Sequence, residues 1–190
     1  LIAIGLWSVR ERSALLRLGP SISGTHGIRT LLEDRQFLLL CIALIPFWAV
    51  FAQLFAAFPL LASQLGGSTA WANAILVVNG LTGVVALALV ARWIERGRIM
   101  FVFIVGLTLA FATIAGTAYM PTLLALLLLV IIFSVGESFV MAASDILTGR
   151  HADGRATALY FGCLNASAGI GAAFGGYVGT MNASAPQDTM

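Results

Sequence analysis

Five long apolar stretches dominate this sequence and restrict what it can fold into. They run over about residues 37–62, 72–91, 99–118, 122–147 and 156–181. A helix needs about 20 apolar residues to cross the hydrocarbon core of a bilayer. Lipid cannot satisfy the polar groups of the backbone, so each stretch is predicted to be helical. The pattern therefore predicts an all-α membrane protein, a polytopic helix bundle with five complete transmembrane helices.

The composition agrees with a membrane environment. Only 9% of the residues are charged, whereas 60% are hydrophobic. A soluble domain carries about 25% charged residues, so this chain has too few charges to cover a surface that faces water. The net charge of +2 is small, and the arginines fall in short groups rather than along one continuous face. Membrane lipid is therefore an expected partner, and nucleic acid is not.

The remaining segments divide the chain around the predicted bundle, which covers residues 37–181. We interpret residues 1–7 as the end of a preceding transmembrane helix, residues 8–36 as a hydrophilic linker, and residues 182–190 as an extracytoplasmic tail or loop. Within the linker, the segment GIRTLLEDR (27–35) fits either a short amphipathic helix on the membrane surface or a solvated tether.

The distribution of arginine predicts the orientation of the bundle. When the five helices are threaded as alternating crossings, the linker and the loops near residues 91–98 and 148–155 share one side. All ten arginines lie in these three segments or at their borders. Loops rich in arginine stay in the cytoplasm, so these segments are predicted to be cytoplasmic. The chain is accordingly expected to be an integral, multi-pass protein of the plasma or inner membrane.

Three segments resemble motifs of a known transporter family. They are IERGR (94–98), VGESFVMAASDI (135–146) and GRATALYFGCLNASAGIGAAFGGYVG (154–179). Together with the long linker, they resemble the C-terminal half of a major facilitator superfamily transporter, and in particular its drug:proton antiporter branch. The resemblance implies that the five helices are helices 7–11 of a fold of 12 helices. It also implies that the partner of this bundle is a missing N-terminal half of six helices in the same chain.

The resemblance further implies a cytoplasmic gate or latch. In this interpretation Asp145 pairs with Arg96 or Arg98 of the loop, and Glu95 and Arg155 belong to the same gate. The alternative for Asp145 is an interfacial carboxylate that simply reaches water.

Glu137 is the strongest functional candidate in the predicted bundle, because it lies deep within the fourth apolar stretch. An ionised carboxylate in the hydrocarbon costs several kcal/mol unless it faces a cavity, pairs with a cation or takes up a proton. We therefore expect Glu137 to handle protons or substrate. The alternative is a neutral glutamic acid that is hydrogen-bonded to a neighbouring helix.

Other polar and small residues in the apolar stretches have two interpretations. Gln53, Asn79 and Asn165 either line a central cavity or join neighbouring helices by hydrogen bonds. A stripe of small residues at intervals of four is predicted to allow close helix packing, and it comprises Ser167, Gly171, Gly175 and Gly179.

These observations predict a secondary active transporter fragment that exports small amphipathic compounds in exchange for protons by alternating access. A major facilitator importer of a sugar, peptide or metabolite is the main alternative, and a membrane scaffold without transport activity is another. An intramembrane enzyme is disfavoured, because no reactive set is present and both histidines, His26 and His151, lie outside the apolar stretches. The chain is therefore predicted to be no enzyme and to bind neither a metal nor a cofactor.

Overall fold

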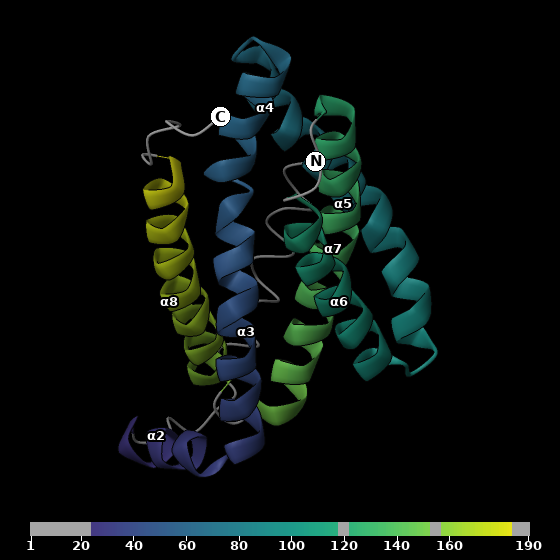
Figure 1. The fold of residues 1–190 in the computed structure, drawn as a ribbon. Helices are drawn as coiled ribbons and strands as arrows, with labels where there is room; N and C mark the ends of the chain where they lie inside the picture. The colour runs from purple at the N-terminus through teal and green to yellow at the C-terminus, as the bar shows by residue number, and fades with distance from the viewer. Residues whose placement is uncertain (1–23, 118–121, 153–156, 184–190) are drawn as a thin grey trace, which may run out of the picture.

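The computed structural model describes residues 24–117, 122–152 and 157–183 of the chain (Figure 1). The predicted end of a preceding helix (1–7), the first part of the linker, Arg155 and the tail after residue 183 lie outside these ranges. The described residues form helices throughout and include no strand. The helices are α2 (Gly24–Glu33), α3 (Arg35–Gln53), α4 (Ala57–Gly66), α5 (Ala70–Glu95), α6 (Ile99–Thr117), α7 (Leu123–Ala152) and α8 (Thr157–Ala183).

Five helical segments in the described part of the chain are long and apolar enough to cross a membrane. They are α5, α6, α7, the main part of α8, and the segment Arg35–Gly66, which combines α3 and α4. This finding confirms the predicted all-α bundle with five membrane-spanning helices. Large apolar side chains such as Leu81 and Val84 of α5 are exposed on its outer surface. In a bilayer such side chains face lipid and carry no penalty for contact with water.

The first segment is interrupted between α3 and α4. The break falls at residues 54–56, just before Pro59. Proline has no N–H, and its ring clashes with the carbonyl group four residues earlier, which is that of Phe55. Pro59 is therefore placed in the first turn of α4, where a helix has no internal acceptor for that N–H. Pro46 lies inside α3 without ending it.

The helices alternate in direction, and one end of the bundle carries the basic segments. Figure 1 shows α2 lying crosswise at the end where α3 and α8 begin, and α4 at the opposite end. The loop between α5 and α6 and the last turn of α7 belong to the same end as α2. This end carries the described arginines, which are Arg29, Arg35, Arg92, Arg96, Arg98 and Arg150. Both α5 and α7 extend beyond the predicted apolar stretches, and α7 continues to Ala152.

Glycine allows the tightest contacts inside the bundle. Gly106 of α6 and Gly136 of α7 lie opposite each other, and a Cβ atom added to either would lie 2.8 Å from the other residue's carbonyl oxygen. Real Cβ atoms do not approach oxygen so closely, so both positions require a residue without a side chain. Since lipid tails are as apolar as leucine, such close backbone contact is a main source of helix association in membranes.

Candidate functional site

Glu137 forms the centre of a polar cluster between α5 and α7. The amide nitrogen Nδ2 of Asn79 on α5 donates a hydrogen bond to Oε2 of Glu137, at 2.8 Å. The same nitrogen donates a second hydrogen bond to Oγ of Ser134, at 3.0 Å. Two residues predicted separately from the sequence, Asn79 and Glu137, are therefore in direct contact. Ser134 is fully buried, and the other two side chains are partly buried.

The cluster lies far from both ends of the helix that carries its carboxylate. Glu137 is 14 residues after Leu123 and 15 before Ala152, which corresponds to about 21–23 Å from each end at a rise of about 1.5 Å per residue. The hydrocarbon core is about 30 Å thick, so Glu137 lies within it for any placement that centres α7 in the bilayer.

The hydrogen bonds leave one oxygen of the Glu137 carboxyl group without a partner among the described residues. Ser134 Oγ donates to the carbonyl oxygen of Val130 at 2.7 Å, and Ser138 Oγ donates to that of Ser134 at 2.9 Å. Both hydroxyl protons are thus used within α7. Asn79 donates a hydrogen bond through Nδ2 to Oε2 of Glu137, so this nitrogen cannot accept a proton from that oxygen. Oε1 of Glu137 makes no hydrogen bond to any described residue, and it is the atom at which a proton or a ligand can bind.

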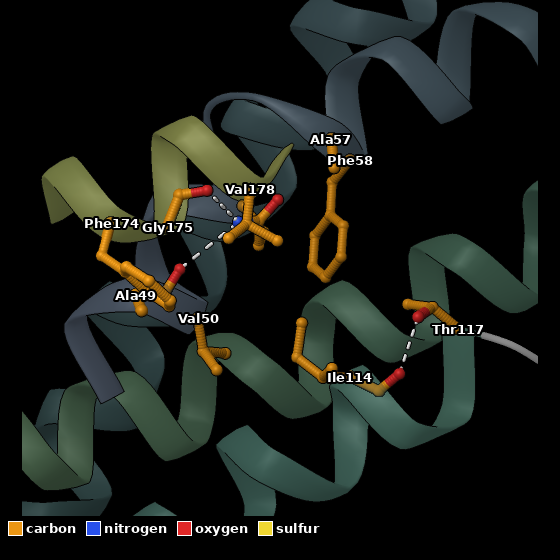
Figure 2. Close-up of a pocket in the computed structure, with 10 residues that line it drawn as sticks. Ala49, Val50, Ala57, Phe58, Ile114, Thr117, Phe174, Gly175 and Val178 are labelled. Carbon is orange, nitrogen blue, oxygen red and sulfur yellow. Dashed lines mark hydrogen bonds between the residues drawn. The ribbon is translucent and has the colours of Figure 1, made fainter. Parts of the chain in front are cut away.

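Gln53 lies in a different part of the bundle, where α3, α4, α6 and α8 surround a cavity of about 330 Å³. Figure 2 shows Val50, Phe58, Ile114 and Val178 lining this cavity from the four helices. Gln53 also lines it, and its Nε2 donates to the carbonyl oxygen of Gly175 at 2.6 Å. The cavity is therefore mainly apolar, and the amide nitrogen of its glutamine already joins α3 to α8.

The predicted stripe of small residues lies at the contact between α8 and α3. All four of its members are buried, namely Ser167, Gly171, Gly175 and Gly179. A Cβ atom at Gly171 would meet the carbonyl oxygen of Ile45, and one at Gly175 would meet that of Ala49. At Gly179 it would lie 2.6 Å from Oε1 of Gln53. The positions on α3 are also four residues apart, so the two helices stay in register along this contact.

The remaining predicted residues are not brought together in the structure. Asn165 is exposed on α8 and makes no hydrogen bond to a described residue. Asp145, Arg96 and Arg98 are exposed as well, and none of them forms an ion pair within the described ranges. Glu95, which precedes Arg96 in the sequence, is exposed as well. Since Arg155 lies outside these ranges, the gate formed by these residues stays a prediction. No three histidine, cysteine or acidic side chains of the described segments form a group that could hold a metal ion.

A second polar cluster, centred on Asp34, joins three helices at the basic end and was not found from the sequence. Asp34 caps α3, because its Oδ1 accepts a hydrogen bond from the backbone N–H of Phe37 at 3.0 Å. Its Oδ2 accepts a hydrogen bond from Tyr160 OH at 3.2 Å and lies 3.0 Å from Nδ1 of His151. Burial opposes the ionisation of Asp34, but these hydrogen bonds outweigh it and lower the pKa of the carboxyl group.

The sequence held only part of the signal for this second cluster. An aspartate before an apolar helix is typical of an N-cap, and Asp34 could have been recognised as one. His151 and Tyr160 lie 117 and 126 residues farther along the chain. No local pattern predicts that contact.

Comparison with known families agrees with this arrangement of apolar helices. The sequence profile of the Major Facilitator Superfamily matches residues 1–183. The chain belongs to the major facilitator superfamily. This result confirms the family suggested by the motifs near Arg96, Glu137 and Gly171. Because the superfamily consists of membrane transporters, it also confirms that the protein is no enzyme.

The chain is also similar to a curated protein whose name refers to multidrug resistance. Multidrug resistance protein MdtH of Proteus mirabilis (strain HI4320) is 24% identical over 155 residues, which cover 81% of this chain. The match covers 38% of the length of that relative, so this chain spans well under half of it. No solved structure matches the chain. As a superfamily member with five apolar helices, the chain is an integral, multi-pass membrane protein.

Proposed function

We propose that this chain is part of a secondary active transporter that exports small amphipathic compounds in exchange for protons. The cluster of Asn79, Ser134 and Glu137 carries the proposal. Keeping a carboxylic acid within the hydrocarbon is costly, and ionisable residues at such depth generally mark the path of an ion or substrate. The relative's name, which refers to multidrug resistance, favours export over the uptake of a sugar, peptide or metabolite.

The geometry of the cluster suggests how Glu137 couples the two movements. Asn79 holds Oε2 by a hydrogen bond, so the carboxyl group keeps its orientation while the proton at Oε1 is exchanged. A protonated Glu137 is neutral and tolerates an apolar environment, whereas the ionised form favours contact with water or with a cationic ligand. Gain and loss of one proton thus change the relative stability of the open and closed states.

The transporter also needs elements that the described residues do not include. Substrate sites in transporters built from repeats form near the bilayer midplane, at the interface between the repeats. We therefore expect a second half of six helices as a partner and a small-molecule substrate that binds between the halves. The arginine-rich end of this bundle is proposed to face the cytoplasm, because basic segments are retained there. In the outward-open state Asp145 is proposed to pair with Arg96 or Arg98.

Dye efflux from cells that produce the full-length protein tests the proposal. Efflux is expected to depend on the proton gradient and to stop when a protonophore is added. Glu137→Gln retains the shape and hydrogen-bonding capacity of the side chain but cannot ionise, so it is expected to abolish efflux that depends on the gradient. Glu33→Gln is the matched control, because Glu33 is an exposed carboxylate of α2 that pairs only with Arg29 among the described residues.

Two results would contradict the proposed proton coupling. Normal amounts of Glu137→Gln in the membrane, together with efflux equal to that of the unmodified protein, would remove Glu137 from the mechanism. Efflux by the unmodified protein that persists after the proton gradient collapses would reject the antiporter. Inward accumulation of the tested compound would instead favour an importer.

A further inference from the structure

Two aromatic rings stack on each other at the basic end of α5 and α6. The rings of Trp93 and Phe101 have centroids 5.4 Å apart and planes inclined by only 6°. Trp93 is 37% exposed and Phe101 is 49% exposed. The stacked pair therefore exposes aromatic surface on the outside of the described bundle and is not part of its core.

Three arginines lie close to this aromatic pair in the sequence. Arg92 is in the last turn of α5, and Arg96 and Arg98 are in the loop that leads to α6. All three are exposed, and none forms an ion pair with a described residue. Glu95 is the one acidic residue from 92 to 98, so this stretch has a formal charge of +2. By contrast, Arg29 at the same end of the bundle is paired with Glu33.

The tryptophans of α5 place this surface at the level of the lipid headgroups. Trp71 lies in the first turn of α5 and Trp93 near its end, 22 residues later. At a rise of about 1.5 Å per residue this spacing is about 33 Å, close to the hydrocarbon thickness of about 30 Å. Tryptophan concentrates at both boundaries between lipid and water. Trp93 therefore marks one boundary, and the three arginines are at the depth of lipid phosphate groups.

Exposed apolar side chains continue from the aromatic pair towards the membrane interior. Leu89 precedes Trp93 by one turn on α5 and is 48% exposed. Ile104 follows Phe101 by one turn on α6 and is 57% exposed. Because Trp93 stacks on Phe101, these two residues lie on adjoining helix faces just below the aromatic pair. They provide an apolar wall for an acyl chain.

We infer that this surface is a binding site for an anionic phospholipid. The phosphate group is bound by Arg92, Arg96 and Arg98, and the glycerol region lies against the Trp93–Phe101 pair. An acyl chain follows the wall formed by Leu89 and Ile104. The excess of positive charge favours a headgroup with net negative charge, because a zwitterionic headgroup carries its own cation. The inference does not depend on proton coupling or on the direction of transport.

Quenching of tryptophan fluorescence by brominated lipid tests this site. The full-length protein is reconstituted in phosphatidylcholine with a fixed fraction of phosphatidylglycerol, and bromine is carried by either one lipid or the other. The fluorescence of Trp93 is obtained by subtracting the fluorescence of Trp93→Phe from that of the unmodified protein. Trp93 is expected to be quenched more strongly by brominated phosphatidylglycerol than by brominated phosphatidylcholine at the same mole fraction.

Charge variants show whether the arginines cause this preference. Replacing Arg92, Arg96 and Arg98 together by glutamine is expected to abolish it. Each single replacement is expected to lower it about fivefold, since one basic residue near an anionic surface contributes about that factor. The matched control replaces three arginines elsewhere at the same end, Arg29, Arg35 and Arg150, and is expected to retain the preference.

The inference fails under any of three results. The first is equal quenching of Trp93 by the two brominated lipids. The second is an equal loss of preference in the test and control triple variants, which would indicate a general effect of charge. The third is loss of preference when inorganic phosphate is added at constant ionic strength, which would indicate a site for a free anion. If the triple variant does not fold, the single variants decide the matter.

Discussion

Replacing Gly175 by alanine is expected to destabilise the protein by separating α8 from α3. A Cβ atom at this position would overlap the carbonyl oxygen of Ala49 and lie 2.7 Å from the Cα atom of the same residue. These are backbone atoms, so no rotation of a side chain can relieve the overlap. The carbonyl oxygen of Gly175 also accepts the hydrogen bond from Gln53, at 2.6 Å. Separation of the helices would lengthen that bond as well.

The expected magnitude follows from three contributions. Overpacking in a tight contact costs about 1–3 kcal/mol, and an interhelical hydrogen bond in a membrane contributes about 0.6 kcal/mol. Alanine is favoured over glycine inside a helix by about 0.8–1.0 kcal/mol. Gly175→Ala should therefore lower the free energy of unfolding by about 0.6–2.8 kcal/mol. At Gly176, the next residue, a Cβ atom would have no neighbour within 4 Å. Gly176→Ala should show only the favourable contribution of the helix.

Thermal unfolding of the full-length protein in detergent measures this difference. Fluorescence-detected gel filtration after heating gives the melting temperature of each variant, and the amount of folded protein in the membrane controls for expression. Gly175→Ala is expected to melt below the unmodified protein and Gly176→Ala at or above it. If Gly175→Ala proves as stable as Gly176→Ala, the close approach of α8 to α3 is not what the structure indicates.

Three further predictions concern other contacts. Gly106→Ala is expected to lower the melting temperature because of its contact with Gly136, whereas Gly80→Ala, which meets no neighbour within 4 Å, is not; equal melting temperatures would contradict this. Asn79→Ala is expected to shift the pH dependence of efflux, since it removes a hydrogen bond to the carboxyl group of Glu137, which is proposed to exchange the proton; an unchanged pH profile would oppose the proposed role. Asp34→Asn is expected to destabilise the protein at pH 7. The pKa of Asp34 is lower in the folded protein than in the unfolded chain, where it is about 3.9. The ionised carboxylate therefore stabilises the fold above that pH, and this stabilisation is lost as the pH falls through the pKa of the folded state. The difference in melting temperature between Asp34→Asn and the unmodified protein should therefore shrink on acidification, and a constant or growing difference would argue against it.

Local patterns predicted most of the helices because a membrane imposes a simple requirement. A backbone surrounded by lipid has to form its hydrogen bonds within one helix, so the length and hydrophobicity of a segment are sufficient to predict its structure. The boundaries were less predictable. The last turns of α7 extend to Ala152, past its apolar stretch, because a helix continues into water where its sequence permits. The break before Pro59 could be expected near a proline, although not its position.

The candidate site was predicted only in part. Glu137 was identified by its charge and its depth within an apolar stretch, because a carboxylate there is rare and costly. Its partners were not assigned to it, since Asn79 is 58 residues away along the chain. Gln53, Asn79 and Asn165 looked equivalent in the sequence, yet they lie in three different environments. Asn79 contacts the carboxyl group, Gln53 bonds to a backbone carbonyl of α8, and Asn165 is exposed on the surface of α8.

By itself, the sequence determined that this protein is a membrane-embedded bundle of helices, which of its segments carry positive charge, and which family it resembles. These properties depend on each residue and its near neighbours, and the bilayer acts on them segment by segment. The tertiary structure alone decided which polar side chains meet, which glycines contact another helix, and where the cavity lies. These features depend on the rotation and separation of helices that pack together, and contacts between residues far apart in the sequence determine both.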